Sequence, residues 1–291
     1  MRNELRHGLL FTSPAFLYFT VFWILPLALA VFYSLTNWVV GGPAKFVGLA
    51  NYAGLLGDPL FRQSVFASIY ITVLTVAGSV LIALGLAVLL NDEHLRGGRL
   101  FRIVIILPVL TDWVATGLVW QLIFLPNQGV LADFLYRLGL RELIGLRWTS
   151  SRELAPLAIV VFSIWKTTGL YAIIFLAALK SVPRQYLEAA RAEGADAWQV
   201  FVNVTLPMIK PISVFILVIA FVSAIGLFEP VFMLTGGGPG DATRTLPLFL
   251  FETFFQFRSG GYASAASVLF LAICLGFALV AARTLRYSHF E

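Results

Sequence analysis

Three charged residues, Asp112, Lys166 and Glu229, interrupt stretches of the chain that are otherwise apolar. A charge near the centre of a lipid bilayer costs roughly 2.5 to 3.5 kcal/mol on insertion scales. Such residues therefore usually face a bundle interior or an aqueous path. The sequence predicts that these three side chains line a route for a polar solute.

Simpler roles remain open for each charge. Asp112 would then cap a broken helix, and Lys166 would snorkel or pair with an acidic group. Glu229 precedes Pro230, whose ring bends a helix, and would only hold helices together. Among the three, Glu229 is the residue we favour most as a solute contact.

Aromatic residues beside polar ones supply a second set of candidates. Sugars are bound by aromatic faces and directional polar groups, because their C–H faces are apolar whereas their hydroxyls need hydrogen-bond partners. At 14% aromatic residues, most of these side chains are expected to face lipid or to pack inside the protein. If the solute is a sugar, the candidates for its pocket near the middle of the membrane are Trp120, Gln121, Trp165, Tyr171 and Phe228.

Catalytic chemistry finds no support in the residues. A phosphate-binding loop needs a Gly-Lys pair, and none of the four lysines follows a glycine. The glycine run at 236–240 lacks a lysine, and is either a turn that re-enters near an outer mouth or a plain flexible loop. The three histidines are scattered without the spacing of metal ligands. We expect no catalytic residue, no metal and no cofactor on this chain.

The composition is that of a membrane protein. Of 291 residues, 59% are hydrophobic and 12% charged, and the mean hydropathy is +0.89. The net charge of +5 does not indicate nucleic-acid binding, because the basic residues flank apolar stretches instead of forming a stripe. The single cysteine, Cys274, excludes an intramolecular disulfide.

Six apolar stretches are long enough to cross the bilayer as helices of about 20 residues. A membrane barrel would show alternation at every second residue, whereas residues 80–90 are apolar throughout. The fold class is therefore predicted to be all-α and polytopic. The predicted spans are 9–35, 65–90, 103–125, 154–179, 211–235 and 262–282.

An even number of spans places both termini on one side of the membrane. That side, with the loops 91–102 and 180–210, carries eleven basic residues, against eight in the opposite loops. The positive-inside rule then predicts cytoplasmic N- and C-termini and a cytoplasmic 180–210 segment.

The 180–210 segment is polar and contains two short helices by its signals. The first has Pro183 in its first turn and stops at Gly194, and the second has Asp196 as N-cap and stops at Leu206 before Pro207. Ala189 and Ala190, beside Glu188, form a knob of small residues that a cleft of another protein would accept closely. A solvated loop without a partner is the alternative.

The spacing in this segment resembles a known signature. Glu188-Ala189-Ala190, then Gly194, then Leu206-Pro207 is similar to the EAA loop of membrane subunits of binding-protein-dependent ABC importers, with Val204 where Ile is usual. Residues 46–52 and 234–243 resemble the carbohydrate branch of that family. The similarity covers nearly the whole chain.

The resemblance implies a type I ABC importer permease fold, with one permease domain over 1–291 and a coupling loop at 180–210. It implies that the ATPase is a separate subunit present in two copies, and that a second permease subunit and an extracytoplasmic solute-binding protein complete the system. The solute would be a sugar or polyol, and the location a bacterial or archaeal plasma membrane. The residues that the resemblance assigns to ATPase coupling are Glu188, Ala189, Ala190, Gly194, Leu206 and Pro207.

Two other classes of protein remain as alternatives. A standalone secondary transporter often shows paired halves and needs no ATPase dock, yet no internal repeat is visible here. A membrane assembly protein would use the 180–210 helices as an interaction surface without transport.

Overall fold

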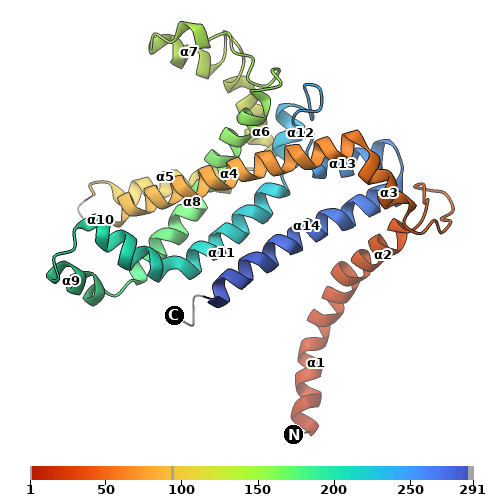
Figure 1. Cartoon of the computed structure of the whole chain (residues 1–291), viewed down its shortest axis with the longest axis horizontal. Helices are drawn as coiled ribbons and strands as arrows, with labels where there is room; N and C mark the ends of the chain where they lie inside the picture. The colour runs from red at the N-terminus through yellow and green to blue at the C-terminus, as the bar shows by residue number, and fades with distance from the viewer. Residues whose placement is uncertain (1, 93–94, 288–291) are drawn as a thin grey trace. The chain divides into compact units, whose positions relative to one another are not determined.

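The computed structural model describes residues 2–92 and 95–287, and their regular structure is helical (Figure 1). An isolated antiparallel bridge between Thr36 and Phe46 is the one β feature among these residues. The predicted all-α class is confirmed.

Backbone contacts divide the chain into two compact units. One comprises Met1–Arg62 and Phe249–Ile273, and the other Gln63–Leu248 and Cys274–Glu291. The boundaries fall inside three helices, α4 (Pro59–Asn91), α13 (Leu246–Phe251) and α14 (Gly260–Tyr287). Because continuous helices cross these boundaries, the division does not test the prediction of one permease domain, which stays a prediction.

The first unit begins with a long apolar helix. α1 (Arg2–Phe19) continues through a π-helical turn, Thr20–Ile24, into α2 (Leu25–Ser34). The carbonyl groups at the end of a helix lack intrahelical donors. The Asn51 amide, at the start of α3 (Ala50–Gly57), donates to the carbonyl oxygens of Ser34 at 2.8 Å and Thr36 at 2.7 Å. The 46–52 motif thus terminates the first span.

The core of the second unit is built around α8 (Ala155–Ser181), which is 61% buried over its most apolar window. It packs against α5 (Gly98–Leu110) and α11 (Leu206–Ile225). At Gly169 the approach is so close that a Cβ atom would overlap the carbonyl oxygen of Ile105. A glycine at this point lets α8 and α5 touch through their backbones.

The third predicted span, 103–125, is not one helix. α5 and α6 (Trp113–Ile123) are bent by 103° at a break that contains Thr111 and Asp112. The Asp112 carboxylate accepts a hydrogen bond of 2.9 Å from the Ala115 amide and so caps α6. Capping, the simpler role considered for Asp112, is confirmed as what its side chain does.

The fifth predicted span, 211–235, also needs correction. A continuous helix runs from Ala197 through a π-helical turn at Phe201–Thr205 to Ile225, so the expected stop at Leu206 is wrong. Pro207 follows the π turn, where the regular i to i−4 hydrogen bonds are already interrupted and its missing N–H matters little. Beyond Gly226, the short helix α12 (Glu229–Leu234) is separate from α11.

Among the described residues, five helices are long and apolar enough to cross a membrane, or six spans if the bent pair counts as one. The five are Phe11–Ser34, Pro59–Asn91, Ala155–Ser181, Ala197–Ile225 and Gly260–Ala281. The prediction of about six spans is therefore confirmed. Between α6 and α8 lies the short helix α7 (Val130–Arg137), followed by a 3₁₀ turn at Arg141–Leu143.

Candidate functional site

The 180–210 segment folds as a helical hairpin of α9 (Arg184–Ala192) and α10 (Ala197–Val200). Gly194 lies between them with φ +89°, a left-handed conformation that favours glycine. The Asp196 carboxylate accepts from the Gln199 amide N–H at 2.8 Å, and the Gln199 side chain accepts from the Asp196 N–H at 3.0 Å. This capping box fixes the start of α10, as the sequence predicts.

The coupling signature lies on the outer face of the hairpin. Glu188, Ala189, Gly194 and Pro207 are exposed, and Ala190 is half-buried. The other face is anchored, because Leu187 packs against the core around α8 and Val200 is buried. Leu206 is likewise half-buried against this core. Glu188, Ala189 and Gly194 are thus accessible at the surface of the hairpin, while their role in coupling stays a prediction.

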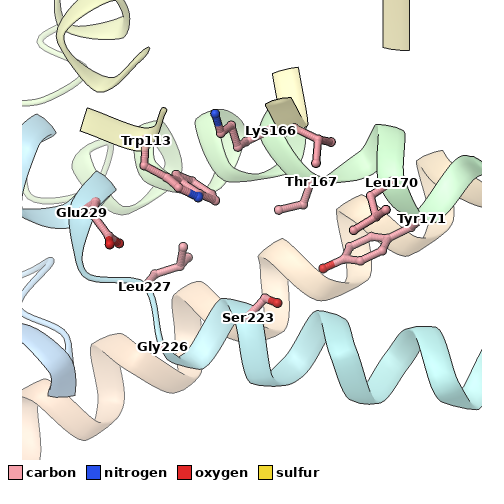
Figure 2. Close-up of a pocket in the computed structure, with 10 residues that line it drawn as sticks. Trp113, Lys166, Thr167, Leu170, Tyr171, Ser223, Gly226, Leu227 and Glu229 are labelled. Carbon is pink, nitrogen blue, oxygen red and sulfur yellow. The ribbon is translucent and has the colours of Figure 1, made fainter. Parts of the chain in front are cut away.

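A cavity of about 250 Å³ with both polar and apolar lining lies between α5, α6, α8, α11 and α12 (Figure 2). It is flanked by the two helix breaks, at Thr111 and at Gly226, which bring several helix ends together. We call it the solute pocket, after the solute contacts that the sequence predicts for some of its lining residues. It is lined by Val109, Trp113, Lys166, Thr167, Leu170, Tyr171, Ser223, Gly226, Leu227 and Glu229.

Three of the predicted path residues, Lys166, Tyr171 and Glu229, meet at this pocket. The other five predicted residues do not line it. Besides Asp112, which caps α6, Gln121 donates from Nε2 to the Met233 carbonyl and so ties α6 to α12.

The predicted aromatic residues pack on one another. The ring centroid of Trp120 lies 5.4 Å from those of Phe162 and of Trp165, and the ring of Phe228 stacks on that of Phe232 at 5.4 Å. These contacts make Trp120, Trp165 and Phe228 part of the packing around the solute pocket. A contact between these residues and a solute stays a prediction.

Lys166 is buried, with 2% of its surface exposed. Its Nζ donates to the carbonyl oxygen of Thr111 at 2.5 Å and to the Thr111 hydroxyl at 2.6 Å, and lies 5.3 Å from the centre of the Trp113 ring. A cation at the C-terminal end of a helix is stabilised by the helix dipole. The ammonium of Lys166 therefore joins α8 to the end of α5.

Glu229, at the start of α12, is exposed. Among the described residues, no hydrogen bond or ion pair engages its carboxylate. The simpler role of pairing with Lys166 is therefore absent from this part of the chain. The carboxylate remains able to accept hydrogen bonds from a solute.

Several pocket residues were missed by the sequence reasoning, above all Trp113, Thr167 and Ser223. On α8, Thr167 lies four residues before the predicted Tyr171, and Leu170 lies four residues after the predicted Lys166. Helical spacing would therefore have found Thr167 and Leu170. Trp113 is placed by the break in the third span, which the apolar pattern did not show.

A smaller cavity of about 20 Å³ adjoins the same wall and shares Trp113, Thr167, Tyr171 and Ser223 with the solute pocket. The hydroxyl oxygens of Thr75 and Ser163, which line it, are buried without a hydrogen-bond partner. A cavity of this size holds about one water molecule. The inner wall of the solute pocket is thus rich in hydroxyl groups.

No group of three His, Cys, Asp or Glu side chains that could hold a metal occurs among the described residues. The groups that meet at the solute pocket are three hydroxyls, one carboxylate, one buried ammonium, two aromatic rings and the aliphatic side chains of Val109, Leu170 and Leu227. Such a set suits reversible binding of a polyhydroxylated molecule.

Comparison with known proteins gives a family match. The profile of the family described as binding-protein-dependent transport system inner membrane component matches residues 79–286.

Relatives match over nearly their whole lengths. The sulfoquinovosyl glycerol transport system permease protein SmoG of Agrobacterium fabrum is 32% identical, over 96% of this chain and 90% of its own. The trehalose/maltose transport system permease protein MalF of Thermococcus litoralis is 31% identical, over 96% and 93%. The lactose transport system permease protein LacF of Rhizobium radiobacter is 33% identical, over 95% and 94%.

Solved structures show the same fold. A bacterial ABC transporter involved in the import of the acidic polysaccharide alginate has a chain that superposes with a TM-score of 0.81 at 21% identity, covering 98% of both chains. A chain of the MetNI methionine ABC transporter gives a TM-score of 0.57 at 19% identity, over 79% of this chain and 96% of its own.

Proposed function

The chain belongs to the binding-protein-dependent transport system inner membrane components, and on this premise we propose that it carries a sugar through one half of a shared pore. It is a multi-pass membrane protein and a permease subunit of an ABC importer. Several relatives are named for sugar transport. Their named solutes differ from one another, so the choice among sugars has to come from the pocket.

The observation that carries the proposal is the solute pocket between two broken helices. It is lined by the exposed carboxylate of Glu229, by the hydroxyl-bearing side chains of Thr167, Tyr171 and Ser223, and by an aromatic residue, Trp113. Sugar hydroxyls need hydrogen-bond partners and sugar C–H faces need an apolar surface, and this wall supplies both. Its 250 Å³ lies just below the usual range of about 300 to 1,000 Å³ for ligand pockets. A partner wall would complete it.

The partners follow from the family. We infer a second permease subunit, two copies of an ATPase subunit that bind the ATP, and an extracytoplasmic solute-binding protein. This chain would itself hold no cofactor, and both termini would lie in the cytoplasm of a bacterial or archaeal cell, as the basic residues predict.

The mechanism we infer is alternating access driven by the ATPase. The helix Ala197–Ile225 has the α9–α10 hairpin at one end and Ser223 of the solute pocket at the other (Figure 1). Its 29 residues span about 43 Å at 1.5 Å per residue. Movement of the hairpin would therefore be transmitted directly to the wall of the solute pocket.

The test is ATP-dependent uptake. The chain is reconstituted with its partner permease, ATPase and binding protein, and uptake of labelled monosaccharides, disaccharides and polyols is measured. We expect uptake of at least one of them, dependent on both ATP and binding protein. Uptake by this chain alone along an ion gradient would favour a secondary transporter, and no uptake by the full complex would favour an assembly protein.

A second arm of this test uses Glu229→Gln. A hydrogen bond to a charged acceptor contributes roughly 1.5 to 3 kcal/mol, so the half-saturating sugar concentration should rise about ten- to a hundredfold. The yield of assembled complex should not change, because Glu229 is exposed. Reduced yield with an unchanged half-saturating concentration would instead show that Glu229 only holds helices together.

A further inference from the structure

The solute pocket carries two opposite charges in different environments. Of its ten lining residues, Lys166 and Glu229 are charged. Lys166 is 2% exposed, whereas Glu229 is exposed. A solute that enters the pocket therefore meets the carboxylate directly and the ammonium only at its buried edge.

The hydrogen bonds of Lys166 go to Thr111, a residue that does not line the cavity. Two of its three N–H donors are taken by the carbonyl and hydroxyl oxygens of Thr111. Figure 2 shows its amino group on the side of the pocket opposite the Ser223 hydroxyl. The residue thus positions the end of α5 and does not present a free cation to the solute.

The charge balance near the pocket is negative. Asp112, next to Thr111 at the same break, adds a second exposed carboxylate. One ammonium therefore stands against two carboxylates, those of Asp112 and Glu229. These carboxylates would repel an anionic solute. Direct hydrogen bonds from a cationic side chain usually offset such repulsion, and Lys166 does not offer them here.

We propose that the solute pocket accepts uncharged polyhydroxylated solutes and rejects anionic ones, and that Glu229 sets this discrimination. A neutral sugar donates its hydroxyl hydrogens to the carboxylate, whereas a carboxylate, sulfonate or phosphate group on the solute is repelled by it. That the solute is a sugar rests on the proposed function. The charge preference is a property of the pocket and is tested without any sugar.

The experiment measures the electrostatic potential in the pocket with thiol reagents of opposite charge. Ser223, which is exposed and lines the pocket, is replaced by cysteine after the single native cysteine is removed by Cys274→Ala. The assembled complex in detergent is treated with the cationic trimethylammonium-ethyl and the anionic sulfonato-ethyl methanethiosulfonates. The mass of this chain reports its modification, and the ratio of the two rates cancels differences in thiol ionisation.

A control cysteine at Gln185, exposed on α9, gives the intrinsic rate ratio of the two reagents. Relative to it, we expect Ser223→Cys to favour the cationic reagent by at least about fivefold, because one nearby negative charge attracts the cationic reagent and repels the anionic one. Adding Glu229→Gln should remove most of this preference, and Glu229→Asp should keep it. Neither change should alter the ratio at Gln185→Cys.

Equal rates at Ser223→Cys, or faster reaction with the anionic reagent, would overturn the proposal, since the partner wall would then supply a dominant positive charge. An unchanged ratio in Glu229→Gln would also overturn it. Failure of sugar uptake with a preserved preference for the cationic reagent would contradict the proposed function alone, so the two results are distinguishable.

Discussion

Lys166 shows how a residue type is assigned a role by its surroundings. Its position inside an apolar stretch indicated a solute path, and it does border the solute pocket. Its hydrogen bonds, however, go to the carbonyl and hydroxyl of Thr111 at the end of α5. A buried ammonium needs such partners because leaving it unpaired is costly. Lys166 and Thr111 are 55 residues apart in the sequence, and only the fold brings them together. The apolar pattern of the sequence therefore could not predict that Thr111 is the partner of Lys166.

This environment gives a prediction for Lys166→Met, which keeps an unbranched side chain one atom shorter and removes its donors. A buried hydrogen bond to a charged group contributes roughly 1.5 to 3 kcal/mol, so thermal unfolding of the assembled complex should move to a lower temperature. Lys180→Met is the matched control, since Lys180 is exposed in the last turn of the same helix. Equal stability of the two variants would contradict the role of Lys166 as a tie between α8 and α5.

At the scale of elements, apolar runs predict that a span exists but not where it breaks. Leu107-Pro108 and the following Thr111-Asp112 are compatible with one continuous apolar run, and only the capped start of α6 reveals the 103° bend. A proline usually ends or kinks a helix, but in the fifth span the π turn lets the helix continue past Pro207. Local signals did place Gly194 and the Asp196 cap, because capping depends on neighbouring residues alone. The solute pocket needs both breaks, and for that reason its full lining was not predictable.

The contact between α5 and α8 yields a prediction about Gly169. A Cβ atom there would overlap the Ile105 carbonyl, so Gly169→Ala should push the two helices apart and lower stability by roughly 1 to 3 kcal/mol. Gly85→Ala on α4 is the control, because a Cβ at Gly85 meets nothing within 4 Å and alanine favours a helix. The measurement is the midpoint of thermal unfolding of the complex with each variant, and the midpoint should be lower with Gly169→Ala. A Gly169→Ala complex as stable as the control would show that the helices are not in backbone contact.

The α9–α10 hairpin yields a prediction about coupling. Glu188→Ala removes the polar anchor of the exposed face, and Gly194→Trp places a bulky side chain where φ is +89°. Both should reduce the stimulation of ATPase activity by loaded binding protein in the reconstituted complex. Gln185→Ala, exposed on the same helix but outside the signature, should not. Normal stimulation and normal uptake in both signature variants would contradict the coupling role.

At the scale of the molecule, exposed carboxylates beside apolar membrane-spanning helices favour a partner subunit. The apolar window of Phe11–Ser34 is 0% buried, and those of the other spans outside α8 are 22% to 28% buried. Lipid covers such surfaces, but it cannot hydrate the exposed carboxylates of Glu229 and Asp112, which lie beside membrane-spanning helices. A second permease subunit that closes a water-filled pore would keep these carboxylates hydrated.

Expression of the chain without a second permease subunit should therefore give aggregated or degraded protein, and co-expression should restore a monodisperse complex. The Glu229→Gln variant offers a more specific readout, since removing an unpaired charge from a pocket that lacks its partner wall should raise the yield of the lone chain but not that of the complex. Yield and size-exclusion profile of the four samples are compared in one detergent. Equal yields for the lone chain with and without Glu229 would show that this carboxylate imposes no need for a partner. Solute uptake by liposomes containing the purified chain alone would show that the chain forms a complete pore.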